Sequence, residues 1–363
     1  MDDATRRILD GTTWAEFCDT LRAAGAVVLG PDTPDDAFDR AEGFRYLSRL
    51  LRSALESFVE NSDAEAPELR RTAHETIKMG ADNPDNHYLN APISGKHAYR
   101  ITGTRGTVHY LGFGTQAGNY ASTGSLQTTG YLDHSQLELG PDGSLEIFVS
   151  VEPRPGNWLR MAPDSRALVV RQTFLDRARE KPAELRIERI DGPHAARHVT
   201  PQSIDRGLVN SARFVLGTAK LFQKWAAGFE AHVNQLPRFD DRAALLAGGD
   251  PNIVYYHSYW RLAPDEALVI EATPPECDTW NFQLNNHWME SLDYRYFTIS
   301  VNKHTAKVQP DGSVRVVVAH EDPGVENWIQ TCGHARGTMC WRWIKAKEHP
   351  QPRTRVVKLA ELR

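Results

Sequence analysis

The pairing of histidine with a carboxylate is the feature of this sequence with the clearest capacity for chemistry. His320 and Glu321 are adjacent, and His334 follows in the next segment. An imidazole titrates near neutral pH and can exchange a proton with a substrate at ordinary pH. We therefore predict His334, His320 and Glu321 to be catalytic residues of general acid–base type. The alternative is that Glu152 and Glu321, each followed by an arginine, are structural and hold a turn or pair with Arg171 and Arg342.

Three amide side chains alternate with apolar residues in a predicted strand that contains Trp280, Phe282 and Leu284. Successive side chains of a strand point to opposite faces, so the amides share one face. A buried amide without a partner costs about 1–3 kcal/mol, so a ligand or water should satisfy each one. We expect a substrate-binding cavity here, with a solvated face as the alternative; the three amides are Asn281, Gln283 and Asn285.

The segment after this strand is rich in aromatic residues. Aromatic rings together with amides suit a neutral, hydroxylated or ring-bearing molecule. The alternative is the edge of a β core with aromatic tips in water. We predict that this segment completes the substrate site and that Tyr294 or Tyr296 shares the cavity with the three amides; its residues are His287, Trp288, Tyr294 and Tyr296.

The sequence lacks the motifs that hold most cofactors. No His-x-His pair of cupin type, no His-Glu-x-x-His and no Cys/His knuckle is present, so we predict no metal. Convergence of separate histidines in the fold is the alternative, with His87, His97, His109 and His134 as the candidates. Neither a glycine-rich phosphate loop after a strand nor a Gly-x-Ser-x-Gly elbow occurs, so we expect no cofactor at all.

These motifs favour an enzyme that acts without a cofactor on a small, partly apolar organic molecule. Hydrolysis, elimination or isomerisation by acid–base residues is the expected class. The alternative is a non-catalytic β protein that binds a carbohydrate or a lipid on one face of a sheet. A deep pocket that contains a carboxylate–histidine contact would favour the enzyme, and a shallow aromatic shelf would favour the binding protein.

Composition narrows the partners and the compartment. The 363 residues are 40% hydrophobic and 25% charged, as in a folded globular protein, and the net charge of −5 makes nucleic acid an unsuitable partner. No run of 18 apolar residues occurs and the start of the chain is acidic, so we expect no membrane span and no signal peptide. The four scattered cysteines favour a reducing cytoplasm. A small-molecule ligand is the expected partner, and homo-oligomerisation stays open.

The elements that must position these residues occur twice. A Pro-Asp-Gly-Ser turn, an acid, an Asn-Trp pair and an arginine follow one another in the same order in both halves of the chain, which predicts an internal duplication. An Asn-Pro-Asp segment and an Asp-Pro-Asn segment precede the two copies. The repeated elements are Pro141–Ser144 and Pro310–Ser313, Glu152 and Glu321, Asn157-Trp158 and Asn327-Trp328, and Arg171 and Arg342.

Periodicity assigns the secondary structure. Residues 1–80 are expected to be helical, with a capping box at Thr13-Trp14-Ala15-Glu16, and residues 205–235 form a second helical stretch. Short runs with Gly, Pro and Asn between them predict strands elsewhere. We therefore predict a mainly β protein with helical segments (α+β), built from two tandem antiparallel β-sandwich or jelly-roll-like repeats. The predicted parts are a helical N-terminal region at 1–80, a first β repeat at 81–200, a helical linker at 201–240 and a second β repeat at 241–363.

Aligning the two copies through this pattern makes Tyr110, Gly112 and Gly114 of the first copy equivalent to the three amides of the second copy. Glycines at these places would allow a backbone or a ligand to approach closely.

Several segments resemble a bacterial family known as domain of unknown function 1214. The resemblance implies jelly-roll-like β domains, in agreement with the duplication, and it implies no established reaction and no catalytic residues. Relatives are often fused to or partnered with a domain numbered 1254, and no such domain is evident here. The residues that carry the resemblance are Gly43–Leu51, Asp82–Asn86, Asn327-Trp328, Gly333-His334, Gly337–Met339 and Arg342-Trp343.

Overall fold

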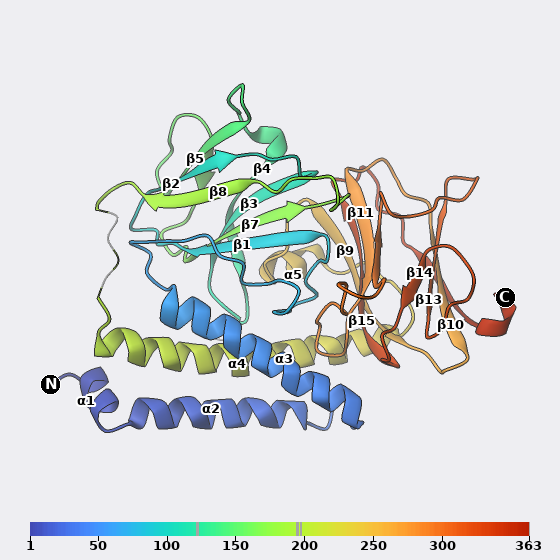
Figure 1. Cartoon of the computed structure of the whole chain (residues 1–363), viewed down its shortest axis with the longest axis horizontal. Helices are drawn as coiled ribbons and strands as arrows, with labels where there is room; N and C mark the ends of the chain where they lie inside the picture. Colours follow the sequence, from blue (N-terminus) through green and yellow to red (C-terminus); the bar gives the residue numbers. More distant parts are fainter. Residues whose placement is uncertain (121–122, 194–195, 197, 363) are drawn as a thin grey trace.

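The computed structural model describes residues 1–120, 123–193, 196 and 198–362. In this part of the chain the strands form four four-stranded sheets. Two sheets pack into one sandwich and two into another, and the sandwiches lie side by side above a layer of helices (Figure 1). The protein is therefore mainly β with helices, as the sequence predicts.

The first sandwich contains one sheet with the strand order β1-β7-β3-β4 and a second with the order β6-β5-β2-β8. Apolar side chains from both sheets fill the space between them, and Tyr99, Ile101, Leu111, Phe113 and Ile147 are fully buried there. The strands are β1 (Asn86–Pro92), β2 (Tyr99–Thr104), β3 (Tyr110–Ala117), β4 (Gln127–Asp133), β5 (Ser144–Ser150), β6 (Trp158–Arg160), β7 (Ala167–Thr173) and β8 (Glu184–Arg189).

The second sandwich has sheets with the orders β12-β11-β15-β9 and β14-β13-β10-β16. Its core is richer in tryptophan, and Trp280 and Trp341 stack with their ring centroids 4.9 Å apart. The strands are β9 (Ile253–Arg261), β10 (Glu266–Ala272), β11 (Thr279–Leu284), β12 (Ser300–Asn302), β13 (Val314–Ala319), β14 (Trp328–Gln330), β15 (Arg336–Ile344) and β16 (Arg353–Lys358).

The two sandwiches have the same topology. Reading β9 to β16 as counterparts of β1 to β8 makes the strand orders of the corresponding sheets identical. Asn157 and Asn327 even hold matching turns, since each amide nitrogen donates to two backbone carbonyls at 2.8 and 2.9 Å. The sequence predicts antiparallel sandwiches, and most strand pairs are antiparallel. One pair in each sandwich is parallel instead, β5 with β6 and β13 with β14.

The strand pairings correct the alignment of the two copies. Arg171 lies opposite Gly112 and Arg342 lies opposite Asn281, so Gly112 is the counterpart of Asn281. By the same register Gly114 corresponds to Gln283. The alignment from the sequence was wrong by two residues, a shift that keeps every side chain on its own face.

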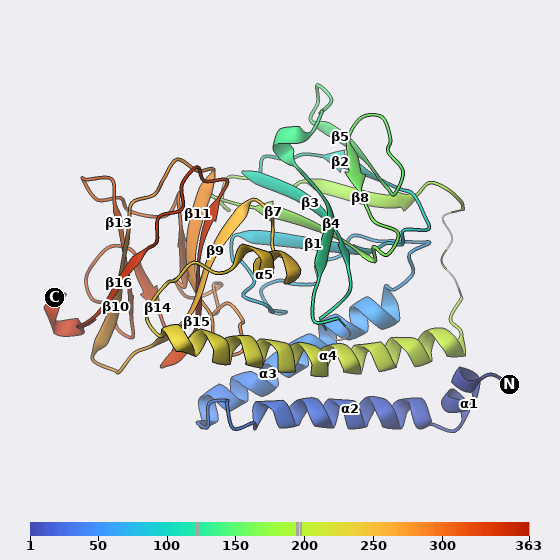
Figure 2. The ribbon, with the colours of Figure 1, turned by 180° about the vertical axis from the view of Figure 1, so that it is seen from behind.

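Helices form a layer under both sandwiches (Figures 1 and 2). The long helix α4 (Pro201–Phe229) runs beneath them, α3 (Ala37–Leu55) crosses it and continues into a π-helical turn, η1 (Glu56–Glu60), and α2 (Thr12–Val28) lies outermost. Shorter helices complete the layer and the connections: α1 (Asp3–Leu9), η2 (His134–Gln136), η3 (Glu230–His232), α5 (Asp241–Leu246) and η4 (Leu359–Glu361).

The starts of these helices follow ordinary capping rules, with one correction. Asp36 caps α3 by accepting from the backbone of Asp39 at 2.8 Å, and Thr200 caps α4 ahead of Pro201. The capping box at Thr13 is wrong, because α2 begins after Gly11 and the Thr13 hydroxyl donates to Asp205 of α4. A tertiary contact replaces the local one.

Candidate functional site

A cavity of about 450 Å³ lies where the two sandwiches meet the helices. Strands β1, β3 and β7 of the first sandwich and β9 and β15 of the second contribute to its wall, and α3, η1, α4 and α5 close the other sides. Figure 2 shows α5 between the two sandwiches with α4 beneath it. The apolar lining includes Phe58, Met79, Phe214, Trp225, Phe229, Phe239, Ile253 and Met289.

Two arginines from equivalent strands line this cavity. Arg171 lies on β7 and Arg342 on β15, and each is the partner of a cavity-lining tyrosine on the neighbouring strand, Tyr88 on β1 and Tyr255 on β9. Among the described residues, neither guanidinium forms an ion pair with a carboxylate. Arg70, which pairs with Glu68, and Arg166 also line the cavity. Arg171 and Arg342 stand apart as the two equivalent guanidinium groups, one from each repeat, without a paired anion among the described residues.

Each arginine is held by the loop that precedes the other repeat. Arg171 donates from Nη2 to the carbonyl of Gly248, and Arg342 donates from Nη2 to the carbonyl of Ala81 at 2.7 Å. Both loop residues have positive φ, +81° at Gly248 and +55° at Ala81. Equivalent residues thus contact one another reciprocally across the interface, which is the pattern of an approximate two-fold axis.

The same reciprocity extends along the two loops. Asp85 accepts from Asn302 of β12 at 3.1 Å, and the corresponding Asn252 donates to Asp133 of β4 at 3.1 Å. The loops carry Asn83-Pro84-Asp85 and Asp250-Pro251-Asn252. In one half of the interface the acid is in the loop and the amide in the strand, and in the other half the amide is in the loop and the acid in the strand. This exchange keeps a hydrogen-bonded acid–amide pair in each half of the interface.

The two tyrosines are placed as hydrogen-bond donors. The Tyr88 oxygen accepts from the backbone of Asn83 at 3.0 Å and the Tyr255 oxygen accepts from the backbone of Asp250 at 3.1 Å. No acceptor for either phenolic proton is found among the described residues. Burial raises the pKa of Tyr88 and raises that of Tyr255 to about 12, so both phenols keep their protons at neutral pH.

The two Tyr–Arg pairs line the same cavity, and the Arg342 guanidinium lies 5.8 Å from the centre of the Tyr255 ring. Burial alone would lower the pKa of each arginine, but neighbouring groups more than offset this: Asp250 first for Arg171 and Cys340 first for Arg342, with Tyr88 and Tyr255 contributing to both. Guanidinium and phenol can both donate hydrogen bonds, and guanidinium cannot accept them. This end of the cavity therefore presents donors and positive charge.

The carboxylates in the cavity wall are already engaged. Asp82 accepts from the backbone and the hydroxyl of Ser291 at 3.0 and 2.8 Å. Glu56 pairs with Arg52 and Glu68 pairs with Arg70. None of the three is bonded to the two cavity arginines.

One histidine, His257 on β9, also lines the cavity. Its ring stacks on Phe229 and Tyr255, with centroids 5.4 and 5.5 Å away. Burial, with a further contribution from Arg342, lowers the pKa of His257 to about 3. The imidazole is therefore neutral at ordinary pH and is too weak a base to be an efficient proton acceptor there.

The three predicted amides are buried, but their partners are protein groups. Asn281 donates to Asn83 at 2.7 Å and to Asp85, Gln283 donates to the Asp82 carbonyl at 2.9 Å, and Asn285 donates to Thr338. They are at most 1% exposed and none contributes to the cavity wall. The prediction that they avoid bulk water is met, and the prediction that they face a cavity shared with Tyr294 or Tyr296 is wrong. The loop of the first repeat satisfies them together with Arg342, whose Nη1 donates to the side-chain oxygens of Gln283 and Asn281 at 2.5 and 3.3 Å.

The aromatic segment after β11 divides between the interior and the surface. His287 and Trp288 are 1% and 2% exposed, with His287 bonded to Tyr259 and Trp288 donating to the Asp39 carbonyl. Tyr294 is half-buried against Lys78, whereas Tyr296 is 75% exposed. None of these four residues lines the cavity, so the structure does not gather them into one binding site.

The predicted acid–base residues also lie outside the cavity. His334 is buried and contacts Asp39 of α3 at 3.2 Å, with Phe38 against its ring. His320 contacts the Thr331 hydroxyl at 2.8 Å, and Glu321 is exposed. The contact between Asp39 and His334 joins α3 to the second sandwich. It is an acid–histidine pair, but the sequence did not indicate Asp39 as its acid.

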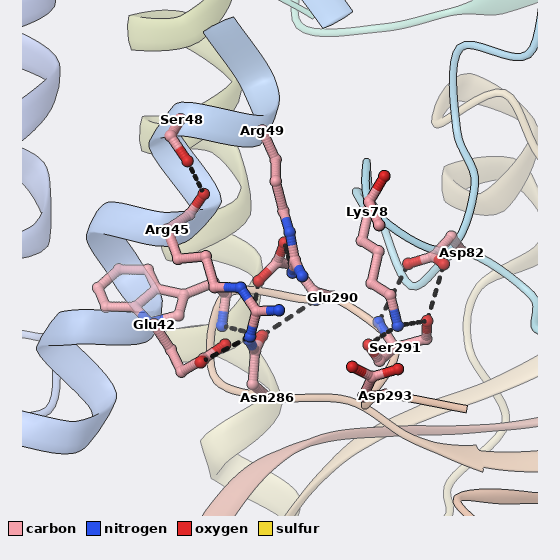
Figure 3. Close-up of polar contacts among 12 residues, drawn as sticks. Glu42, Arg45, Ser48, Arg49, Lys78, Asp82, Asn286, Glu290, Ser291 and Asp293 are labelled. Atoms are coloured by element: carbon pink, nitrogen blue, oxygen red, sulfur yellow. Dashed lines mark hydrogen bonds and ion pairs between the residues drawn. The ribbon is translucent and has the colours of Figure 1, made fainter. Parts of the chain in front are cut away.

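A second buried polar cluster stands next to the cavity wall (Figure 3). Arg49 of α3 pairs with fully buried Glu290 at 2.7 Å, and Asn286 donates to the same carboxylate at 2.9 Å. Lys78 is 1% exposed and donates to the Ser291 and Leu292 carbonyls at 2.7 and 2.6 Å. Every charged group named here has a protein partner, so we assign the cluster to holding the loop between β11 and β12 against α3.

No group of three or more His, Cys, Asp or Glu side chains in the described part of the chain is arranged to hold a metal ion. Within the same residues, none of the helices is both long and apolar enough to cross a membrane.

Comparison with known proteins places the chain among uncharacterised relatives. Residues 264–348 match the model of a family described as a protein of unknown function (DUF1214). An uncharacterized protein from Burkholderia cenocepacia, known from its crystal structure, is 56% identical, with 99% of each chain covered and a TM-score of 0.97. The chain belongs to the DUF1214 family.

A second solved structure is less similar to this DUF1214 protein. A Vibrio parahaemolyticus protein of known structure is 12% identical, with 93% of this chain and 100% of the other covered and a TM-score of 0.49. No curated protein matches the chain.

The cavity residues left only a partial signal in the sequence. Arg171 and Arg342 stand out as part of the repeat, where the alternative interpretation makes them structural partners of Glu152 and Glu321. An arginine in a strand whose neighbours are apolar was the available clue, since such a position must be buried and needs a partner. The partnering tyrosines and the opposing loop could be found only from the arrangement of the two sandwiches.

Proposed function

We propose that this DUF1214 protein binds a small, partly apolar organic anion in the cavity between its two repeats. The observation that carries the proposal is the pair of arginines without a carboxylate partner, Arg171 and Arg342, in a wall that is otherwise largely apolar. Guanidinium groups in such surroundings recognise carboxylates and phosphates through directed hydrogen bonds.

The remaining lining supports the apolar part of the ligand. Five aromatic side chains, Phe58, Phe214, Trp225, Phe229 and Phe239, come from the helical layer and its connection to the second sandwich. A volume of about 450 Å³ is in the range of sites for small organic molecules. A ligand with a charged end and a ring-bearing or aliphatic body matches both features.

Binding is better supported than acid–base catalysis. The histidine in the cavity wall, His257, has a pKa lowered by burial to about 3, and the carboxylates of the wall are bonded to other protein groups. The candidates His334, His320 and Glu321 lie elsewhere. The hypothesis of a cofactor-independent enzyme stays a prediction, and a reaction in this cavity would need a group supplied by the substrate.

The experiment that tests the proposal is a thermal-shift screen of organic acids and their primary amides, followed by titration calorimetry of the hits. We expect acids to stabilise the protein more than the matched amides do, and Arg171→Gln to weaken acid binding at least tenfold. Arg261→Gln is the matched control. Arg261 forms a surface ion pair with Glu230 and does not line the cavity, so its loss should not change acid binding. Equal affinity for acids and amides would refute the proposal.

A further inference from the structure

We infer that the anionic group of the ligand is a carboxylate that lies near the approximate two-fold axis between the repeats, with one oxygen bound by Tyr88 and Arg171 and the other by Tyr255 and Arg342. This inference rests on the proposed function and specifies the class of its ligand. It depends on the equivalence of the two Tyr–Arg pairs rather than on the presence of positive charge alone.

The two Tyr–Arg pairs occupy equivalent positions in the two repeats, although Arg342 also donates from Nη1 to the side chains of Gln283 and Asn281. Tyr88 faces Arg171 across β1 and β7, and Tyr255 faces Arg342 across β9 and β15. Each tyrosine accepts from the backbone of the residue five positions earlier in the chain, and each arginine is tied to a loop carbonyl of the other repeat. The donors are therefore arranged as two matching halves around one cavity.

The shape of the anion follows from this arrangement. A carboxylate has two equivalent oxygens, so two matching donor sets can satisfy it completely. A phosphonate or a sulfonate has a third oxygen, which would need a further donor. Most of the exposed cavity surface is apolar, although polar side chains such as Arg166 and Asn90 also line it. An anionic oxygen directed at the apolar part of the wall would be costly.

Both repeats must contribute to the affinity. Arg171 and Arg342 belong to different sandwiches, and each guanidinium is held by a contact across their interface. A ligand bound by both pairs is anchored symmetrically. A ligand bound by one pair alone would leave the other pair without an anion.

The test is titration calorimetry at pH 7 with benzoate and 4-phenylbutyrate as probes and with phenylphosphonate, benzenesulfonate and benzamide as comparisons. We expect the carboxylates to bind more tightly than the phosphonate, the sulfonate and the amide. Tyr88→Phe and Tyr255→Phe should each weaken carboxylate binding about tenfold, since each removes one hydrogen bond to a charged group.

Tyr256→Phe is the matched control. Tyr256 neighbours Tyr255 on β9 but points into the core of the sandwich, and its hydroxyl donates to the His349 carbonyl at 2.7 Å. Its loss removes one buried hydrogen bond and should change the affinity less than about twofold. The stability of all three variants is measured by urea unfolding, so a loss of affinity can be separated from a loss of folding.

The outcomes separate this inference from the proposed function. Loss of affinity in one tyrosine variant but not the other would overturn the shared carboxylate and leave anion binding intact. Tighter binding of phenylphosphonate or benzenesulfonate would overturn the carboxylate and keep the anion. Equal binding of benzamide and benzoate, or no binding of either carboxylate at millimolar concentration, would overturn both.

Discussion

Arg171 and Arg342 are equivalent residues that each donate a hydrogen bond to the loop of the opposite repeat, at Gly248 and Ala81 respectively. This exchange fixes both guanidinium groups beside one cavity. It also makes the interface between the sandwiches part of the candidate site, because either arginine would lose its support if the sandwiches separated.

The acid–amide exchange across the interface predicts a compensating pair of substitutions. Asn302→Asp places a second carboxylate opposite Asp85, and we expect a loss of about 2–4 kcal/mol in the free energy of unfolding. Adding Asp85→Asn recreates the Asp133–Asn252 arrangement of the other half and should recover most of that loss. Urea unfolding of the two single variants and the double variant measures this. A double variant less stable than Asn302→Asp would contradict the reciprocal interface.

The contact between α2, α3 and the loop after β11 predicts opposite effects for two helical glycines. A Cβ at Gly43 would lie 2.6 Å from Trp288 and 2.7 Å from Val28, so Gly43→Ala should destabilise the protein by about 1–3 kcal/mol. A Cβ at Gly25 on α2 would meet no atom within 4 Å, so Gly25→Ala should stabilise by up to about 1 kcal/mol. Thermal unfolding compares the two, and equal effects would show that α3 packs differently.

The buried ion pair between Arg49 and Glu290 predicts strong non-additivity. Glu290→Leu leaves a buried guanidinium without its anion, and we expect it to cost about 3–5 kcal/mol. The double variant Arg49→Met, Glu290→Leu removes both charges and should be less destabilised than the sum of the single variants. A double-mutant cycle in urea measures the coupling. Additive effects would mean that the pair does not hold the loop against α3.

Buried histidines predict that stability falls on acidification. Burial lowers the pKa of His287 to about 4 and that of His257 to about 3, below the ordinary value of 6.5. Between the folded and unfolded pKa values the unfolded chain binds more protons than the folded one. The stabilising contribution of these neutral histidines is therefore fully present above pH 6.5, and the free energy of unfolding decreases as the pH falls toward 4. Each imidazole contributes a slope of up to about 1.4 kcal/mol per pH unit. Urea unfolding across this range should show a shallower slope for His287→Asn; an unchanged slope would contradict the assignment.

The sequence predicted the parts of the fold that depend on local pattern. The repeated Pro-Asp-Gly-Ser turns and the Asn-Trp pairs mark equivalent places in the two sandwiches. The pattern also showed that Asn281, Gln283 and Asn285 share a face and need partners. It could not show which partners, because the loop around Asp82–Asp85 reaches them from the other repeat.

The cavity was beyond prediction for the same reason. Its walls come from the outer faces of two sheets and from helices far apart in the sequence, and no local pattern records how two sandwiches pack. The capping box at Thr13 failed because a tertiary partner, Asp205, took its hydroxyl. The echo of Asn83-Pro84-Asp85 in Asp250-Pro251-Asn252 was the one sequence feature that pointed to the interface, and its meaning becomes clear only from the reciprocal contacts.

The most direct test of anion binding between the repeats is a crystal structure of the protein with 4-bromobenzoate, in which the anomalous signal of bromine locates the ring. We expect bromine in the cavity near Trp225 and Phe229, with the carboxylate within hydrogen-bonding distance of both Arg171 and Arg342. Bromine outside this cavity, or a carboxylate turned away from both arginines, would contradict the proposed site.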